Sequence, residues 1–131
     1  MTNKKLGNSF ESVFCEILFR EGFWCHNLVQ NQAGQPADVI AVRDGKSYLI
    51  DCKVCSRGRF PFSRIEDNQH TAMRAWQESG NGTGWFALKC EGYIFMLDYD
   101  TLKRLSKTQS SISFKDMCFY GRVLEAWVVF A

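Results

Sequence analysis

Long apolar runs are missing from this sequence. No segment is long enough to span a bilayer, and no signal peptide opens the chain, so we expect a soluble, cytoplasmic protein. A strong charge of one sign is missing too. The formal net charge is only +2 at pH 7, which permits a polyanionic partner but does not require one.

A second Cys-x-x-Cys motif is also absent. Cys52 and Cys55 have the spacing of zinc and redox sites, but on a regular strand they would point to opposite faces. This geometry argues against an interaction protein held together by zinc, although that remains an alternative. Most of the six cysteines lie in apolar runs, where Cys behaves as a small buried hydrophobe.

Repeats and domain linkers are absent as well, so we expect one domain over residues 1–131. Apolar periodicity and turn residues predict helices over 8–22 and 63–78, a short helix over 98–105, and strands over 23–30, 85–89, 93–97 and 126–131, with 112–120 left ambiguous. This order predicts an α/β fold, a mixed β-sheet flanked by helices.

The most informative stretch is the predicted hairpin over residues 36–53. Asp44-Gly45 between two apolar runs favours a two-residue type I′ turn. Counting back from this turn places Asp38 directly opposite Asp51. Because strand side chains alternate faces, Lys53 shares the face of Asp51.

Two opposed carboxylates repel, and a fold tolerates them when positive charge sits between them. Lys53 is one candidate and a divalent cation is the other. Oxygen ligands suit Mg²⁺ or Mn²⁺ better than zinc. The alternative is that one Asp is a strand-end or turn residue and a bulge shifts the register.

Two further polar residues lie on apolar helix faces. Glu11 stands beside the stripe of the first helix, where it could complete a capping box with Asn8 or add a third carboxylate to the acidic site. Gln69 interrupts the inner stripe of the second helix, and an inward polar group needs a partner. That partner could be backbone in the core or the acidic site with its substrate.

The arrangement of these residues resembles the PD-(D/E)XK nuclease superfamily, whose fold is restriction-endonuclease-like. Asp51-Cys52-Lys53 fits the second half of the signature, while Pro36-Ala37-Asp38 has one residue inserted between Pro and Asp. The likeness narrows to Holliday junction resolvases. Residues 7–11 and 18–23 resemble the opening of the archaeal (Hjc) type, and residues 60–69 and 84–97 resemble the RecU type.

This resemblance implies a Mg²⁺-dependent endodeoxyribonuclease that acts on four-way junctions as a homodimer, of bacterial or phage origin. The implied metal ligands are Asp38, Asp51, the carbonyl of Cys52, and Glu11 directly or through water. Lys53 would orient or activate the attacking water, and Gln69 would position the water or the phosphate. We expect Lys53 beside two carboxylates to stay protonated without metal.

Basic residues bracket the acidic hairpin in sequence and would touch DNA phosphates, which gives affinity without sequence choice; they are Lys4, Lys5, Arg57, Arg59 and Arg64. Ordinary solvated surface is the alternative for these residues. Two other functions stay open: a less selective DNA nuclease of the same fold, and a non-catalytic nucleic-acid-binding module.

Overall fold

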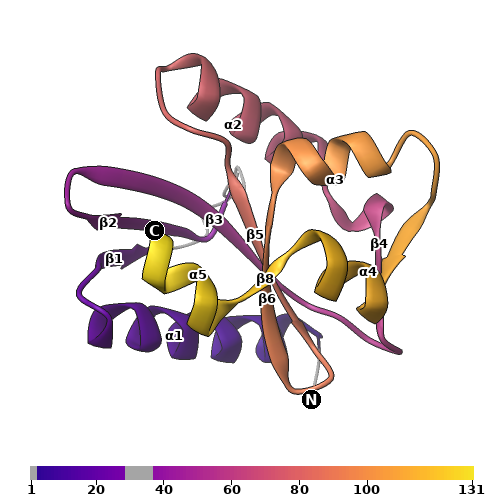
Figure 1. The fold of residues 1–131 in the computed structure, drawn as a ribbon, viewed down its shortest axis with the longest axis horizontal. Coiled ribbons are helices and arrows are strands. Elements are labelled where there is room, and N and C mark those ends of the chain that lie inside the picture. Colours follow the sequence, from indigo (N-terminus) through magenta and orange to yellow (C-terminus); the bar gives the residue numbers. More distant parts are fainter. Residues whose placement is uncertain (1–2, 29–36) are drawn as a thin grey trace.

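A mixed β-sheet with helices on both faces forms the centre of the molecule (Figure 1). The computed structural model describes residues 3–28 and 37–131, with side chains from residue 10 onward. The elements are α1 (Asn3–Arg20), β1 (Trp24–Asn27), β2 (Val39–Arg43), β3 (Lys46–Val54), β4 (Arg59–Pro61), the 3₁₀ turn η1 (Phe62–Arg64), α2 (Asp67–Glu78), β5 (Trp85–Cys90), β6 (Tyr93–Asp98), α3 (Tyr99–Leu105), β7 (Ser111–Ser113), α4 (Phe114–Tyr120), β8 (Arg122–Val123) and α5 (Leu124–Phe130).

The main sheet has the strand order β1-β2-β3-β5-β6-β8, and β4 pairs with β7 in a separate ribbon. Neighbours in the main sheet are antiparallel except β3 and β5, which run parallel because α2 lies between them in the chain. The predicted α/β architecture, a mixed sheet flanked by helices, is therefore confirmed.

The predicted hairpin is confirmed with its register. Asp44 and Gly45 have positive φ of 52° and 77°, as a type I′ turn requires, and Arg43 pairs with Lys46. Pairing continues without a shift to Val39 and Ile50. The same chemistry recurs between β5 and β6, where Glu91 and Gly92 also have positive φ.

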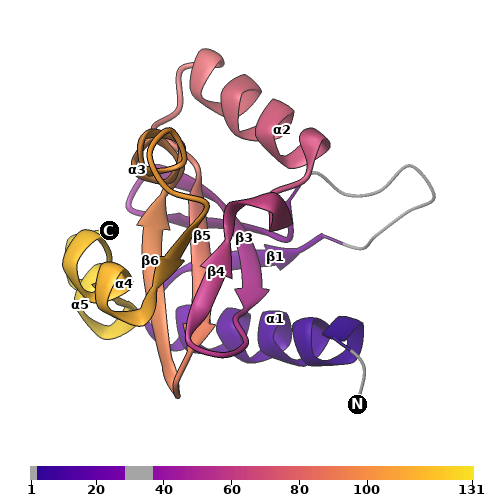
Figure 2. The ribbon, with the colours of Figure 1, turned by 90° about the vertical axis from the view of Figure 1, so that its right-hand side faces the viewer.

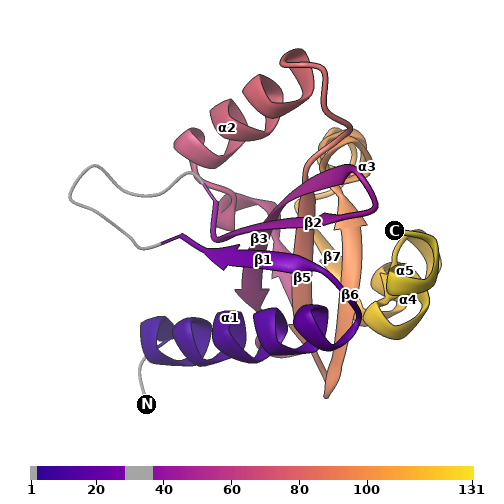
Figure 3. The same ribbon diagram turned by 90° about the vertical axis from the view of Figure 1, so that its left-hand side faces the viewer.

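Helices lie on both faces of the sheet (Figures 2 and 3), and each face carries a hydrophobic layer. Side chains of α1 and α5, including Phe14 and Trp127, pack on one face against β2, β3 and β5. The other face is covered by side chains of α2, α3, α4 and the β4–β7 ribbon. The chain changes faces at β8, which pairs with β6 at the end of the sheet.

The first helix begins earlier than predicted. It starts at Asn3, so Asn8 lies inside the helix, and the predicted cap at Asn8 with its capping box to Glu11 is wrong. The residues before Asn8 include Lys and Leu, which favour helix and extend it by more than a turn. The predicted end is confirmed: Gly22 has φ +88°, and the N–H of Phe23 donates to the carbonyl of Leu18.

The predicted last strand is a helix. Leu124, Trp127 and Val128 are all buried, and their i, i+3, i+4 spacing is that of one helix face. Val129 and Phe130 are exposed. A short apolar run alone does not separate a strand from a buried helix, and here the packing of Trp127 on the sheet decides for helix.

Two other segments each divide into two elements. The helix predicted over 63–78 divides into η1 and α2, because Glu66 starts α2 with a capping box to Gln69. The ambiguous stretch 112–120 divides into strand β7 and helix α4, where Ser113 caps the helix and accepts a hydrogen bond from the N–H of Asp116.

Candidate active site

The predicted acidic residues meet at one edge of the structure. In Figure 3, the first half of α1, the end of β1 and the start of β2 lie at the same side, with the beginning of α2 above them. Asp38 stands one residue before β2 and is held from both neighbouring strands. Its N–H donates to the carbonyl of Ile50 at 3.2 Å, and its carbonyl accepts from the N–H of Leu28 at 2.7 Å.

The carboxylate of Asp38 is oriented by β3. The main-chain N–H of Cys52 donates to Asp38 Oδ2 at 2.8 Å. The regular ladder ends one pair before the predicted Asp38–Asp51 pair, but the two carboxyl groups still interact. Sequence reasoning missed the Cys52 amide, although the hairpin register places it beside Asp38.

Asp51 is a buried acid in the middle of the sheet, with 1% of its side chain exposed. Its pKa is raised well above the ordinary value, first by burial and then by the neighbouring Asp38 carboxyl, while Lys53 opposes the shift. Among the described residues, Asp51 Oδ2 accepts no hydrogen bond. A buried oxygen without a partner is costly and calls for a ligand.

Lys53 lies on the same face of β3 as Asp51, as the alternation of side chains along a strand predicted. Its Nζ is 3.5 Å from Asp51 Oδ2, and only 13% of its side chain is exposed. The ammonium therefore approaches Asp51 without completing a hydrogen bond to it. This places one positive charge beside a group of three acidic side chains, Glu11, Asp38 and Asp51.

Glu11 joins the group from α1. The side chain is half-buried, and its pKa is raised from 4.5 to about 7, first by burial and then by the Asp38 carboxyl, with Lys53 opposing. The Asp38 carboxyl raises the pKa of both Glu11 and Asp51, so it is the acid that lies between α1 and β3. The structure thus supports Glu11 as a third carboxylate, not as a cap.

The raised pKa of Glu11 predicts an unusual pH dependence of stability. Between pH 4.5 and about 7 the folded protein holds a proton on Glu11 that the unfolded chain has released, so stability should fall as pH rises through this window. Urea unfolding in a chelator, at several pH values, measures the slope. Glu11→Gln should flatten it, and the exposed Glu16→Gln on the same helix should not. Equal slopes in all three proteins would contradict this assignment.

Gln69 is buried at the start of α2, as its position on the inner stripe predicted. Its Oε1 accepts a hydrogen bond from the N–H of Glu66 at 3.0 Å, which completes the capping box. The observed partner is therefore backbone at the helix start. No contact between Gln69 and the acidic residues is seen in the described part of the chain, and its catalytic role stays a prediction.

The five predicted DNA-contacting residues differ in their surroundings. Arg57 and Arg59 are exposed near the end of β3, and Arg59 donates to Ser111 Oγ at 2.7 Å. Arg64 is half-buried, donates to the carbonyl of Val54 at 2.6 Å, and lies over the ring of Phe60. The backbones of Lys4 and Lys5 belong to α1, but their side chains lie outside the described residues.

The cysteines are all free. Cys52 packs in the layer of α1 while Cys55 packs in the opposite layer, so the two thiols cannot chelate one zinc ion and the zinc alternative is wrong. Cys15 and Cys25, from α1 and β1, have their sulfur atoms 3.4 Å apart. The hydrogen bond from Cys25 lowers the pKa of the Cys15 thiol.

The acidic site fits a hard divalent cation by its donor chemistry. Asp38, Asp51 and Glu11 offer carboxylate oxygens, and the buried, unpartnered Oδ2 of Asp51 is the observation that favours a cation there. Within residues 3–28 and 37–131, no three His, Cys, Asp or Glu side chains already form a metal-binding cluster. Glu11 would therefore contribute by moving or through water.

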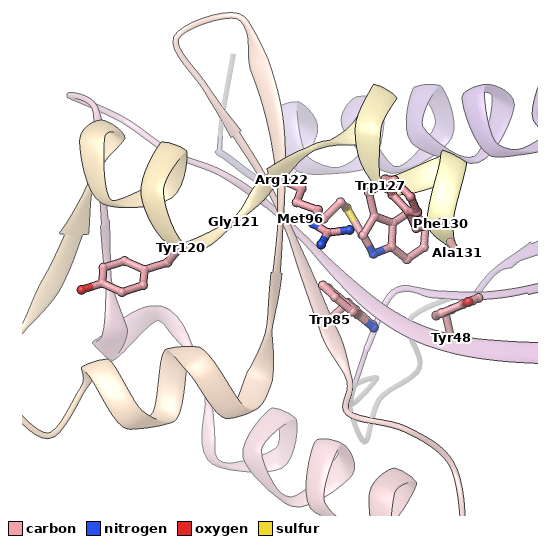
Figure 4. Close-up of a pocket in the computed structure, with 9 residues that line it drawn as sticks. All are labelled: Tyr48, Trp85, Met96, Tyr120, Gly121, Arg122, Trp127, Phe130 and Ala131. Atoms are coloured by element: carbon pink, nitrogen blue, oxygen red, sulfur yellow. The ribbon is translucent and has the colours of Figure 1, made fainter.

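Two surface cavities lie away from these acids. One, of about 300 Å³, is lined by residues of β3, β5, β6 and the α4–α5 region, among them Trp85 and Trp127 (Figure 4). The other, of about 390 Å³, lies between the hairpin turn and the segment before β5. Neither is lined by a predicted catalytic residue. No described helix is both long and apolar enough to cross a membrane.

The sequence matches a protein-family model described as archaeal Holliday junction resolvase (Hjc), over residues 2–119. Among solved structures, the chain is similar to the 1.6 Å structure of Hjc from Archaeoglobus fulgidus, a Holliday junction resolvase from an archaeal hyperthermophile. The TM-score is 0.72 at 15% identity, over 93% of this chain and 97% of that one. No curated protein matches the sequence. The family match includes every predicted site residue and excludes α5, and it gives no support for a bacterial or phage origin.

Proposed function

The chain belongs to the archaeal Holliday junction resolvase family and is a junction-resolving endonuclease, and we propose that Asp38, Asp51 and Lys53 form its active site. One observation carries this assignment. Asp51 is almost fully buried, has an oxygen without a hydrogen-bond partner, and stands 3.5 Å from an ammonium. A fold that needed only stability would favour an apolar side chain at such a position.

The cation that we propose for this site is Mg²⁺, with Mn²⁺ as a substitute. Asp38 and Asp51 would hold it, with the carbonyl of Cys52 and with Glu11 directly or through water. When bound, such an ion supplies positive charge at the phosphoryl oxygens and a water acidic enough to ionise near neutral pH. The protein holds the Asp38 carboxylate ready for this role through the Cys52 amide.

Lys53 and Gln69 would act on the substrate side. The Lys53 ammonium is close to the carboxylates and can donate to the attacking water or to a phosphate oxygen. Gln69 Oε1 accepts a hydrogen bond in the capping box, and its amide nitrogen is the group that would donate to a phosphate oxygen or to water. The general base is left unassigned among the carboxylates and Lys53.

We further propose that the protein acts on four-way DNA as a homodimer, because two sites can then cut two strands. The exposed guanidinium groups of Arg57 and Arg59 would contact phosphates, and such contacts weaken with salt. Arg64 would instead hold the loop after β3, since it bonds to Val54. Lys4 and Lys5 stay in the proposal from sequence, as do a single domain over 1–131 and a cytoplasmic location.

Lys53→Ala tests the site directly. We expect cleavage of a labelled four-way junction in Mg²⁺ to fall by about 10²–10³-fold, because one preorganised positive donor is lost, while junction binding without metal persists. Lys46→Ala, an exposed lysine at the hairpin turn, is the matched control and should cut normally. A linear duplex of the same sequence is tested beside the junction.

The same assay separates the alternatives. Paired symmetric cuts in the junction alone agree with the proposal. Equal cutting of the duplex would favour a less selective nuclease of this fold. Tight binding without cutting under any metal condition would favour a non-catalytic nucleic-acid-binding module. Unchanged cutting by Lys53→Ala would remove Lys53 from the site.

A further inference from the structure

A pair of thiols joins α1 to β1 close to the acidic site. Cys25 Sγ donates a hydrogen bond to Cys15 Sγ at 3.4 Å, and ten residues separate the two positions. Cys15 is half-buried and Cys25 is buried. A hydrogen bond to the Cys15 sulfur favours its thiolate form, which is the form that oxidants attack.

Cys15 lies on the helix that carries Glu11, and Cys25 lies on β1, the strand next to β2. Cys15 follows Glu11 by four residues on α1, so the two side chains lie on the same side of the helix, one turn apart. The negative charges of Glu11 and Asp38 are close enough to raise the pKa of the Cys15 thiol, but the hydrogen bond from Cys25 outweighs them and lowers it. Cys25 pairs with Ala41 on β2, the strand that begins just after Asp38. A covalent bond between the sulfurs would therefore tie together the two elements that position Glu11 and Asp38.

We propose that Cys15 and Cys25 form an oxidation site that closes to a disulfide and reduces cleavage at the neighbouring acids. Hydrogen peroxide transfers one oxygen to the Cys15 thiolate, which, on taking up a proton, gives a sulfenic acid and water. The Cys25 thiol then attacks that sulfur, the S–S bond forms, and a second water leaves. A dithiol reductant restores both thiols by exchange and is itself oxidised to a disulfide.

Closing the bond changes the geometry of the acidic site. A disulfide has its sulfurs about 2.05 Å apart, so the sulfurs must approach from the present 3.4 Å. Any movement of α1 toward β1 during this approach carries Glu11 with it, because Glu11 and Cys15 are on the same helix. Displacements of about 1 Å at a catalytic group can cost about 100-fold in rate. The effect on cleavage rests on the proposed function, whereas the disulfide itself does not.

The other cysteines provide internal controls. Cys55 and Cys90 interact in the hydrophobic layer on the opposite face of the sheet. Cys52 is buried beside the site, and Cys118 is exposed and could link two molecules. We therefore place all variants in a Cys118→Ser background. Trypsin separates every cysteine into its own peptide, with Cys15 in residues 6–20, Cys25 in 21–43, Cys55 in 54–57 and Cys90 in 90–103.

The Cys118→Ser protein is treated with hydrogen peroxide, its free thiols are alkylated, and it is digested with trypsin. The masses of the peptides are then measured by mass spectrometry. We expect peptide 6–20 linked to 21–43 with the loss of two hydrogens, and separation of the two after dithiothreitol. Adding Cys15→Ser should remove the link while circular dichroism shows a folded protein. A link only between 54–57 and 90–103, or none at all, would overturn the proposal.

Cleavage of the four-way junction is then measured with the same samples. We expect oxidation to lower the rate at least about tenfold, recovery after dithiothreitol, and no response to peroxide in the Cys15→Ser protein. A linked protein that cuts at the normal rate would refute the regulatory part. If the reduced protein cuts nothing, the proposed function fails, while the peptide result still decides whether the disulfide forms.

Discussion

Asp51→Asn is expected to abolish metal-dependent cleavage of a four-way junction, by about 10³-fold or more, and to make the metal-free protein more stable. The first effect follows because an amide replaces a carboxylate that would hold the cation. The second follows because burial and the Asp38 carboxyl raise the pKa of Asp51, so its charged form is unfavourable in the fold. Asn has the shape of the neutral acid, and its amide can donate to Asp38.

The gain in stability should be about 1 kcal/mol above neutral pH, because an unfavourable buried charge is removed but Lys53 loses a neighbour. Urea unfolding in a chelator measures it, and excess Mg²⁺ should narrow the difference by binding only the native site. Asp44→Asn is the matched control: it makes the same chemical change at an exposed turn residue with positive φ, where Asn is equally suited. Loss of both stability and activity in Asp51→Asn would mean that Asp51 is mainly structural.

Trp127→Ala is expected to cost about 3–5 kcal/mol of unfolding free energy, the largest effect of a single truncation proposed here. The Trp127 ring packs on three aromatic rings. The centroid distance is 5.9 Å to Phe23, and it is 5.1 Å to Tyr48 and 5.6 Å to Trp85, two residues that are labelled beside Trp127 in Figure 4. These three rings come from the residue just before β1 and from two strands of the sheet, β3 and β5. Removing the indole leaves a cavity between α5 and the sheet.

Chemical denaturation followed by circular dichroism measures this loss. Phe130→Ala on the same helix is the control, because Phe130 is 70% exposed and its ring lies under the guanidinium group of Arg122. We expect that change to stay within about 0.5 kcal/mol. Similar losses in the two variants would show that α5 is not anchored by Trp127. Because α5 lies outside the family match, the result also tests whether this segment belongs to the core.

The hairpin and its acids could be predicted because each step is local. Asp44-Gly45 fixes the turn, the turn fixes the register, and strand alternation then puts Lys53 on the face of Asp51. The helix spanning Glu11 was also found from its periodicity. These signals do not depend on the rest of the chain. The same short stretches of sequence therefore predicted both the acidic site and the likeness to a family.

The errors, and the alternatives left open for Gln69, arose where local signals are shared by several structures. Asn8 is a good cap, but it is equally tolerated inside a helix whose earlier residues extend it. Gln69 on an inner stripe could serve a substrate or a backbone group, and the start of α2 at Asp67 put the N–H of Glu66 within its reach. Short apolar runs near the end of the chain fit both strand and helix.

The sequence by itself determined the turn, the register and the set of acids with their lysine, because backbone sterics at Asp44-Gly45 act over a few residues. Tertiary structure alone decided that Glu11 from α1 meets Asp38, that the two sulfurs of Cys15 and Cys25 come together, and that α5 is a helix on the sheet. These outcomes depend on burial and on contacts between segments distant in sequence, and no local pattern encodes them.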